Sequence, residues 1–215
     1  MNEPTGVPQG ANPRNSDDDA LTRILTAIGL TPPEVYAPAD DSFLMIDVLA
    51  HIPVARKQVL DMGTGSGILG LYCAMRDASV TASDIDAAAM EQAARAAKSL
   101  GVELMLVVSD LFSNISGRFD LILFNPPYLP SRGFSDRSVD GGPRGISIAH
   151  RFLNNLRGYL KPEGEALLLL SSLNNPTSVQ EQHGNFEFSV LARRSFFFEE
   201  LEVLRVRFRD NLAVQ

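Results

Sequence analysis

Hydrophobic and polar residues change their spacing along the chain, and these changes predict the order of the structural elements. Residues 1–18 lack hydrophobic periodicity and contain proline, glycine, asparagine and an aspartate run, so we expect a disordered tail. From Ala20, apolar residues recur at helical spacing up to Gly29, which predicts a short amphipathic helix. A second helix is expected near residues 40–50, after a segment broken by prolines.

From Lys57, short apolar runs alternate with helical stretches, which is typical of β–α units and a largely parallel sheet. The helix over 86–100 is the clearest, because it is rich in alanine and ends at Gly101. Seven strands are predicted, over 57–61, 79–83, 103–108, 119–124, 164–171, 186–193 and 200–209. The last two are joined by a segment too short for a crossover helix, so they should form a C-terminal antiparallel hairpin, with Phe196–Phe198 packed in it. The fold class is therefore α/β, with helices on both faces of the sheet.

Composition adds limits on domains and partners. The chain has 215 residues, 45% of them hydrophobic and 21% charged, which favours one domain over 19–215, with N-terminal helices at 19–56 and a core at 57–215. A net charge of -7 argues against direct binding of nucleic acid by charge. One cysteine, three scattered histidines and no long apolar stretch predict a cytoplasmic protein without a metal site or membrane segment.

Three alternate glycines follow the first core strand directly. Gly63, Gly65 and Gly67 lie where that strand should turn into a helix, and glycine there lets a ligand approach the backbone. This position predicts a cofactor loop rather than a plain turn. Residues 65–70 also satisfy the pattern GxGxxG, so the loop alone leaves a dinucleotide-dependent dehydrogenase open.

Acidic residues follow the next two strands at the same edge of the sheet. Asp84 can accept hydrogen bonds from two ribose hydroxyls, whereas Asp86 is placed to cap the following helix. Asp110, after the third strand, could meet an adenine amino group or cap a loop. Because ligands of open α/β sheets bind outside the carboxyl ends of the strands, these residues and the glycine loop should form one site.

The fourth strand ends in Asn125-Pro126-Pro127-Tyr128, which distinguishes among the possible reactions. Two successive prolines lack N–H groups, so carbonyl oxygens and the side-chain oxygen of Asn125 remain as acceptors for a planar NH2 group. Tyr128 can stack on a flat amide or base. Such a pocket can align a nitrogen with a methyl donor bound on the neighbouring glycine loop, which predicts methylation of an amine or amide nitrogen.

Together, D-M-G-T-G-S-G, the acid after the second strand and N-P-P-Y resemble the Rossmann-like class I S-adenosylmethionine-dependent methyltransferases over most of residues 34–209. Within them, N-P-P-Y with V-Y-A-P-A-D-D-S-F resembles the HemK-type protein-(glutamine-N5) methyltransferases, in particular their short eukaryotic and archaeal branch. The second motif is the more specific one. Taken without the resemblance, it is a proline turn before a helix capped by Asp40, Asp41 or Ser42.

The resemblance implies a role for each motif residue. S-adenosylmethionine would be covered by a lid and held by the loops after three strands, and the substrate amide would be held after the fourth. The implied lid residues are Tyr36, Pro38 and Asp41; the cofactor residues are Asp61, Gly63, Thr64, Gly65, Asp84, Ile85, Asp110, Leu111 and Asn125; the catalytic residues are Asn125, Pro126, Pro127 and Tyr128.

The same resemblance implies two partners, a class 1 peptide-release factor with its GGQ glutamine as substrate, and a small zinc-binding activator subunit. The apolar third strand, 103–108, should lie at the sheet edge and could pair with a partner. Relatives often carry Asp or Asn where the glycine-rich segment 140–145 has Arg144, so this position bears on substrate preference. A helix is expected after it, over 145–158.

Other substrates and functions remain possible from the sequence alone. An exocyclic amine of adenine or guanine is also a planar NH2 group, and Arg132, Arg137 and Arg144 cluster near the motif, although the net charge argues against nucleic acid. Lysine is a less suitable substrate, because its ammonium group is tetrahedral and fits the acceptors poorly. A non-catalytic function is disfavoured, because such a protein would not need an intact Asn125. We identify no general base, because His150 should be solvated on the following helix.

Overall fold

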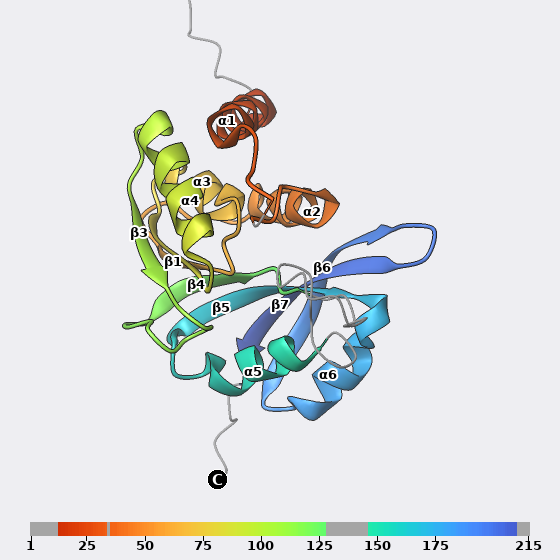
Figure 1. The fold of residues 1–215 in the computed structure, drawn as a ribbon. Coiled ribbons are helices and arrows are strands. Elements are labelled where there is room, and N and C mark those ends of the chain that lie inside the picture. Colours follow the sequence, from red (N-terminus) through yellow and green to blue (C-terminus); the bar gives the residue numbers. More distant parts are fainter. Residues whose placement is uncertain (1–12, 34, 128–145, 210–215) are drawn as a thin grey trace, which may run out of the picture.

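Seven strands form one sheet in the order β3-β2-β1-β4-β5-β7-β6 (Figure 1). The computed structural model describes residues 13–33, 35–127 and 146–209. Strands β1 to β5 run parallel, β7 is antiparallel to β5, and β6 is antiparallel to β7, so the predicted sheet and hairpin are confirmed. The strands are β1 Gln58–Met62, β2 Ser79–Asp84, β3 Leu104–Val108, β4 Phe119–Phe124, β5 Leu160–Ser171, β6 Phe186–Ser195 and β7 Glu200–Phe208.

Helices cover both faces of the sheet, as predicted (Figure 1). Side chains along β4 alternate between the two faces: Leu121 and Leu123 pack under α1 to α3, whereas Ile122 and Phe124 pack against α5. Burial on both faces explains why the parallel strands read as continuous apolar runs. The helices are α1 Pro13–Ile28, α2 Asp40–Leu49, α3 Ile68–Ala74, α4 Ala87–Leu100, α5 Ser147–Leu156, the 3-10 helix η2 Ser172–Asn174 and α6 Pro176–Gln182.

Several boundaries differ from the prediction. Helix α1 begins at Pro13, ahead of the expected end of the tail, because proline is well suited to the first helical position, where an N–H has no partner. Strand β5 begins at Leu160 rather than near residue 164. A Cβ at Gly164 would lie 2.7 Å from the Phe119 carbonyl oxygen, so glycine here permits close approach of β4 and β5 rather than a turn. Elements η2 and α6 were not predicted.

The ends of the sheet bear on the site and its surroundings. Strand β3 lies at one edge, as expected, and the β6–β7 hairpin lies at the other. The phenylalanines of the hairpin turn do not pack in it: Phe197 is 92% and Phe198 85% exposed. The expectation was wrong because the turn extends past the ends of the neighbouring strands (Figure 1). Among the described residues, no helix is both long and apolar enough to cross a membrane.

Candidate active site

The strand order reverses next to β1, whose neighbours are β2 and β4, and the glycine loop lies at this switch point. Gly63, Gly65 and Gly67 all have positive φ angles, of 64°, 51° and 87°, which L side chains rarely adopt. The loop is tied to the next strand, because Thr64 N donates to the Ser83 carbonyl oxygen at 2.9 Å. These glycines therefore shape a backbone turn that a larger residue would strain.

Asp61 lies beneath this loop and is 1% exposed. Its Oδ2 accepts hydrogen bonds from Thr64 Oγ1 at 2.5 Å and from Gly70 N at 2.9 Å. Burial raises the pKa of this carboxyl to about 6, while the hydrogen bonds from Thr64 and Gly70 lower it. A Cβ at Gly70 would lie 2.9 Å from Oδ2, so the start of α3 is packed directly on the carboxylate.

Asp84, at the end of β2, joins the second strand to the glycine loop. Its Oδ2 accepts from Gly65 N and its Oδ1 from Asp86 N, both at 3.0 Å. Burial raises the pKa of Asp84, and the backbone hydrogen bonds oppose this shift. Asp86 caps α4 through Ala88 N at 2.9 Å, as predicted. Ile85 is 59% exposed beside this carboxylate and offers an apolar surface.

Asp110 follows β3, and its side chain is exposed. Its Oδ2 pairs with Arg151 Nη2 of α5 at 2.8 Å, a contact that the sequence did not indicate. Leu111 has a φ of 49° and packs against the core beneath α5. The Asp110 carboxylate therefore pairs with a side chain of α5 rather than capping a loop.

The segment before α2 lies on the glycine loop. A Cβ at Gly65 would be 3.4 Å from both the Cβ and the carbonyl oxygen of Tyr36. Tyr36 Oη donates to Asp41 Oδ2 at 2.7 Å, and Ser42 N donates to Asp41 Oδ1 at 2.6 Å. The half-buried Pro38 lies between these residues.

Asp41 is 2% exposed, and its side-chain hydrogen bonds explain why it does not cap α2 as predicted. The N-cap is Ala39, without a side-chain hydrogen bond, so the expectation that Asp40, Asp41 or Ser42 caps the helix was wrong. The Asp41 carboxylate instead holds the tyrosine that contacts the loop. A residue that looks like a cap in sequence therefore braces the segment over the site.

Asn125 follows β4 on the other side of the loop. A Cβ at Gly63 would be 3.5 Å from the Phe124 ring and 4.0 Å from the Asn125 carbonyl oxygen, so the two motifs are adjacent. Asn125 Oδ1 is buried and accepts no hydrogen bond from any residue that the structure describes. Leaving a buried acceptor unpaired costs about 1–3 kcal/mol, which favours a ligand donor at this atom.

Pro126 is buried and Pro127 half-buried, next to this oxygen in the chain. Tyr128, Arg132, Arg137 and the segment 140–145 with Arg144 lie outside the described residues. The structure thus brings the segment before α2, the glycine loop, Asp84 and Asn125 together at the carboxyl ends of the parallel strands. The positive-φ cradle, the buried acids and the unpaired amide oxygen suit a cofactor with polar hydroxyl and amino groups beside an NH2-bearing substrate.

Two histidines that the sequence left apart are in contact. His150 Nδ1 lies 2.8 Å from His183 Nε2, joining α5 to the end of α6. Burial and His150 both lower the pKa of His183, which is 6% exposed. His150 is half-buried, so it is less exposed to solvent than expected. No sequence signal identified the pair, because α6 itself was not predicted.

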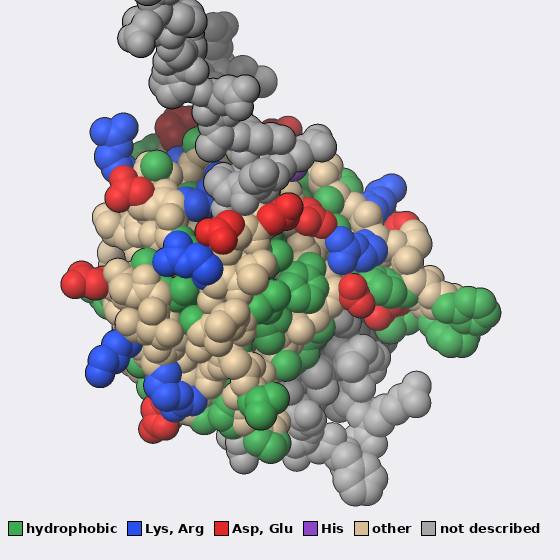
Figure 2. All heavy atoms as spheres, turned by 90° about the horizontal axis from the view of Figure 1, so that it is seen from above, with side chains coloured by type: hydrophobic (Ala, Val, Ile, Leu, Met, Phe, Trp, Pro, Cys, Tyr) green, Lys and Arg blue, Asp and Glu red, His purple; other side chains and the backbone are tan. Residues whose placement is uncertain are grey.

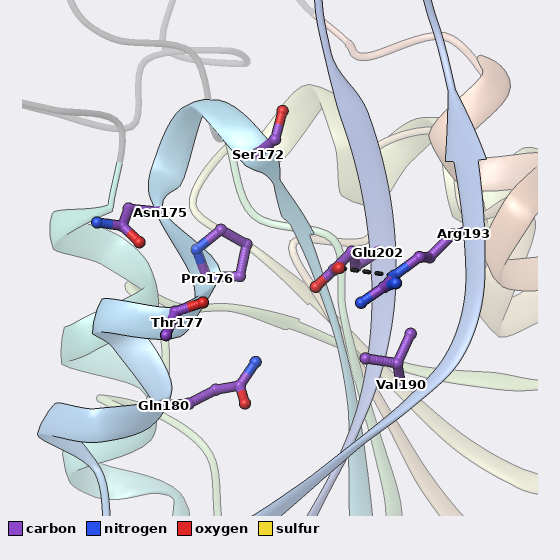
Figure 3. Close-up of a pocket in the computed structure, with 8 residues that line it drawn as sticks. All are labelled: Ser172, Asn175, Pro176, Thr177, Gln180, Val190, Arg193 and Glu202. Atoms are coloured by element: carbon purple, nitrogen blue, oxygen red, sulfur yellow. Dashed lines mark ion pairs between the residues drawn. The ribbon is translucent and has the colours of Figure 1, made fainter.

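A cavity of about 350 Å³ lies away from the glycine loop, between η2, α6 and the hairpin (Figure 3). Arg193 and Glu202 project into it from β6 and β7, at 2.8 Å from one another, facing Gln180 of α6 (Figure 3). No sequence feature indicated it.

Comparison with known proteins gives a consistent result. The family model described as methyltransferase small domain matches residues 39–197. The chain is 38% identical over 181 residues to a Methanocaldococcus jannaschii protein named "putative protein N5-glutamine methyltransferase", covering 80% of this chain and 91% of that protein. It is 30% identical over 162 residues to methyltransferase HEMK2 of Mus musculus, covering 68% and 76%.

Among solved structures, a chain of the E. cuniculi Mtq2–Trm112 complex, described as responsible for methylation of the eRF1 translation termination factor, matches with a TM-score of 0.69 at 24% identity. The match covers 82% of this chain and 99% of that chain. At this identity the likeness concerns the fold, and it agrees with the sheet order described above.

Proposed function

Because the chain belongs to the methyltransferase small domain family and is an S-adenosylmethionine-dependent methyltransferase, we propose that it methylates the side-chain amide nitrogen of a glutamine, in the GGQ motif of a class 1 peptide-release factor. The observation that carries this proposal is the buried, unpaired Oδ1 of Asn125. A primary amide supplies the N–H donor that this oxygen lacks. The names of the relatives support glutamine as the amide-bearing side chain.

The cofactor residues are proposed from their placement around the glycine loop. Asp61 and the turn Gly63-Thr64-Gly65 would hold the methionine part of S-adenosylmethionine, and Asp84 the ribose hydroxyls. At the rim of the site, Ile85, Asp110 and Leu111 would lie beside the adenine. The proposed cover of the whole cofactor consists of Tyr36, Pro38 and Asp41. When bound, S-adenosylmethionine supplies an electrophilic methyl group on a sulfonium.

The residues after β4 would act on the substrate nitrogen. An amide nitrogen is a poor nucleophile, because its lone pair is delocalised, so it must be held in line with the methyl group. Asn125 Oδ1 and the Pro126 carbonyl oxygen accept from the NH2 group, and these hydrogen bonds strengthen as positive charge develops on nitrogen. The nitrogen would form a bond to the methyl carbon while the carbon–sulfur bond of the sulfonium breaks, leaving a neutral thioether, and the nitrogen would lose one proton to water. In this proposal Pro127 and Tyr128 complete the pocket wall.

A small partner subunit is proposed for the free edge of β3. This edge carries two exposed apolar side chains, Met105 at 67% and Val108 at 49%. No other described strand pairs with this edge, so its backbone groups can be joined by another strand, apart from the Val108 carbonyl oxygen, which accepts from Asn114 Nδ2. The presence of Trm112 with Mtq2 in the similar structure supports a partner of this kind. We further propose that this subunit binds zinc and that the enzyme is cytoplasmic.

Mass spectrometry of a release factor incubated with the enzyme and S-adenosylmethionine tests the substrate. We expect one methyl group on the GGQ glutamine, and none with Asn125→Ala, although the variant still binds S-adenosylmethionine in calorimetry. The assay is run with and without a candidate partner subunit. Absence of methylation in both conditions, with cofactor binding intact, would reject the glutamine proposal and favour an exocyclic amine of adenine or guanine in RNA or DNA.

A further inference from the structure

The β6–β7 hairpin ends in aromatic side chains that no described residue covers. Phe197 is 92% exposed, Phe198 85% and Phe196 39%. The rings of Phe197 and Phe198 are 4.6 Å apart and nearly perpendicular, at 83°, so they form one apolar tip. Figure 2 shows hydrophobic side chains gathered on a projection of the surface, and Figure 1 shows the hairpin standing out from the sheet.

The hairpin is braced on both sides at its base. Toward α2, Arg194 Nη2 pairs with Asp47 Oδ2 at 2.8 Å. Toward η2, Ser171 Oγ donates to Glu199 Oε2 at 2.7 Å, and Glu200 N donates to Ser172 Oγ at 3.0 Å. The base of the hairpin is therefore held in place, so binding of a partner would need to order little beyond the rings themselves.

The strand register places the tip relative to the site. Phe124 of β4 pairs with Leu168 of β5, and Leu168 pairs with Leu204 of β7, so these residues lie at one level of the sheet. At about 3.3 Å per residue, the chain from Leu204 to Phe198 places the tip roughly 15–20 Å beyond the level of Asn125. The tip and Asn125 both lie on the side of the sheet where the parallel strands end. A substrate that reaches both points must be a macromolecule.

Charge around the tip favours a protein over nucleic acid or an anionic membrane. The two arginines nearest the tip are neutralised in ion pairs: Arg193 Nε lies 2.8 Å from Glu202 Oε1, and Arg194 is bound to Asp47. Glu199 follows Phe198 directly, forms no ion pair with a described residue and would repel phosphate. On the face toward α6 lies the polar cavity of Figure 3, which can admit side chains of a folded partner.

We propose that the tip formed by Phe197 and Phe198 is a docking element for the protein substrate, inserting into an apolar hollow of its surface while its glutamine occupies the site at Asn125. This inference rests on the proposed function, because it takes the substrate to be a folded protein. The tip selects the protein that carries the glutamine, and Asn125 selects the amide.

Steady-state kinetics with two substrates test the proposal. One is the whole release factor, and the other is a pentapeptide centred on its GGQ glutamine, whose arms of two residues reach only about 7 Å. We expect Phe197→Ala/Phe198→Ala to raise KM for the whole protein about 10- to 100-fold, as loss of central aromatic anchors does. Its kcat, its kinetics on the pentapeptide and its melting temperature should match wild type. Leu30→Ala, at a side chain 99% exposed between α1 and α2, is the matched control.

An unchanged KM for the whole release factor in the double variant would overturn the inference while leaving the proposed function intact. Equal losses on protein and pentapeptide would also overturn it, because the tip would then act on the site itself. Loss of binding to single-stranded RNA, with unchanged protein kinetics, would assign the tip to nucleic acid. If wild type methylates neither substrate, the proposed function is rejected, and the docking inference that rests on it is rejected as well.

Discussion

Replacing Asp61 by asparagine tests how the glycine loop is built. Folding raises the pKa of this buried carboxyl from 3.8 to about 6, chiefly by desolvation. A rise of two units corresponds to about 3 kcal/mol of preference for the neutral form. Because the folded pKa is above the unfolded one, the native state holds more protons between these values, so the free energy of unfolding falls as pH rises through that window. Above pH 6 the Asp61 carboxyl is charged in both states, and the full cost of burying this charge, about 3 kcal/mol, remains.

Asparagine has nearly the same shape and stays neutral, and its Oδ1 can accept from both Thr64 Oγ1 and Gly70 N. We therefore expect Asp61→Asn to exceed wild type in free energy of unfolding by up to about 3 kcal/mol at pH 7.5, with the gap closing toward pH 4. Urea unfolding followed by circular dichroism at several pH values measures this gap. Calorimetry should show weaker binding of S-adenosylmethionine by the variant.

Asp77→Asn is the matched control, because Asp77 is exposed and its φ of 65° is one that asparagine tolerates. Its effect on stability should not follow the pH course expected for Asp61. Thr64→Val should raise the upper limit of the pH window, since the Thr64 hydrogen bond lowers the pKa of Asp61 in the folded state. A pH-independent gap for Asp61→Asn would show that burial of the charge is not what costs stability.

Four further changes test separate parts of the structure. Gly70→Ala should lower the free energy of unfolding by about 1–3 kcal/mol in urea titrations, because its Cβ would lie 2.9 Å from Asp61 Oδ2; an unchanged midpoint would contradict this packing. Asn125→Ala should leave the unliganded enzyme as stable as wild type or more so, since it removes an unpaired buried oxygen, and marked destabilisation in a thermal melt would argue for a structural role. Wild type should lose stability relative to His183→Gln as pH falls below 6.5, because the lowered pKa keeps His183 neutral when folded while the unfolded chain takes up a proton; parallel pH curves would refute this. Met105→Lys, on the β3 edge, should abolish co-elution with the proposed partner subunit in size-exclusion chromatography without changing the melting temperature, and retained co-elution would place the partner elsewhere.

The elements and the strand ends were predictable because their signals are local. The apolar runs of the parallel strands identify them without knowledge of their neighbours, and a strand followed by alternating glycines predicts a turn into a helix. Asp86 capped α4 as predicted, since a cap depends only on residues within one turn. The parallel order then places the acids and Asn125 at one edge. This much of the fold and of the candidate site follows from patterns a few residues long.

Contacts between distant segments depended on the tertiary structure. Asp41 could have capped α2, but its carboxylate binds Tyr36, and that choice depends on Tyr36 lying against Gly65. The His150–His183 contact depends on how α5 and α6 pack, and the exposure of Phe197 depends on how far the hairpin extends past β5. In each case several partners are compatible with the local sequence. Burial and packing select among them, because the free energy of a polar or aromatic side chain depends on which groups surround it after folding.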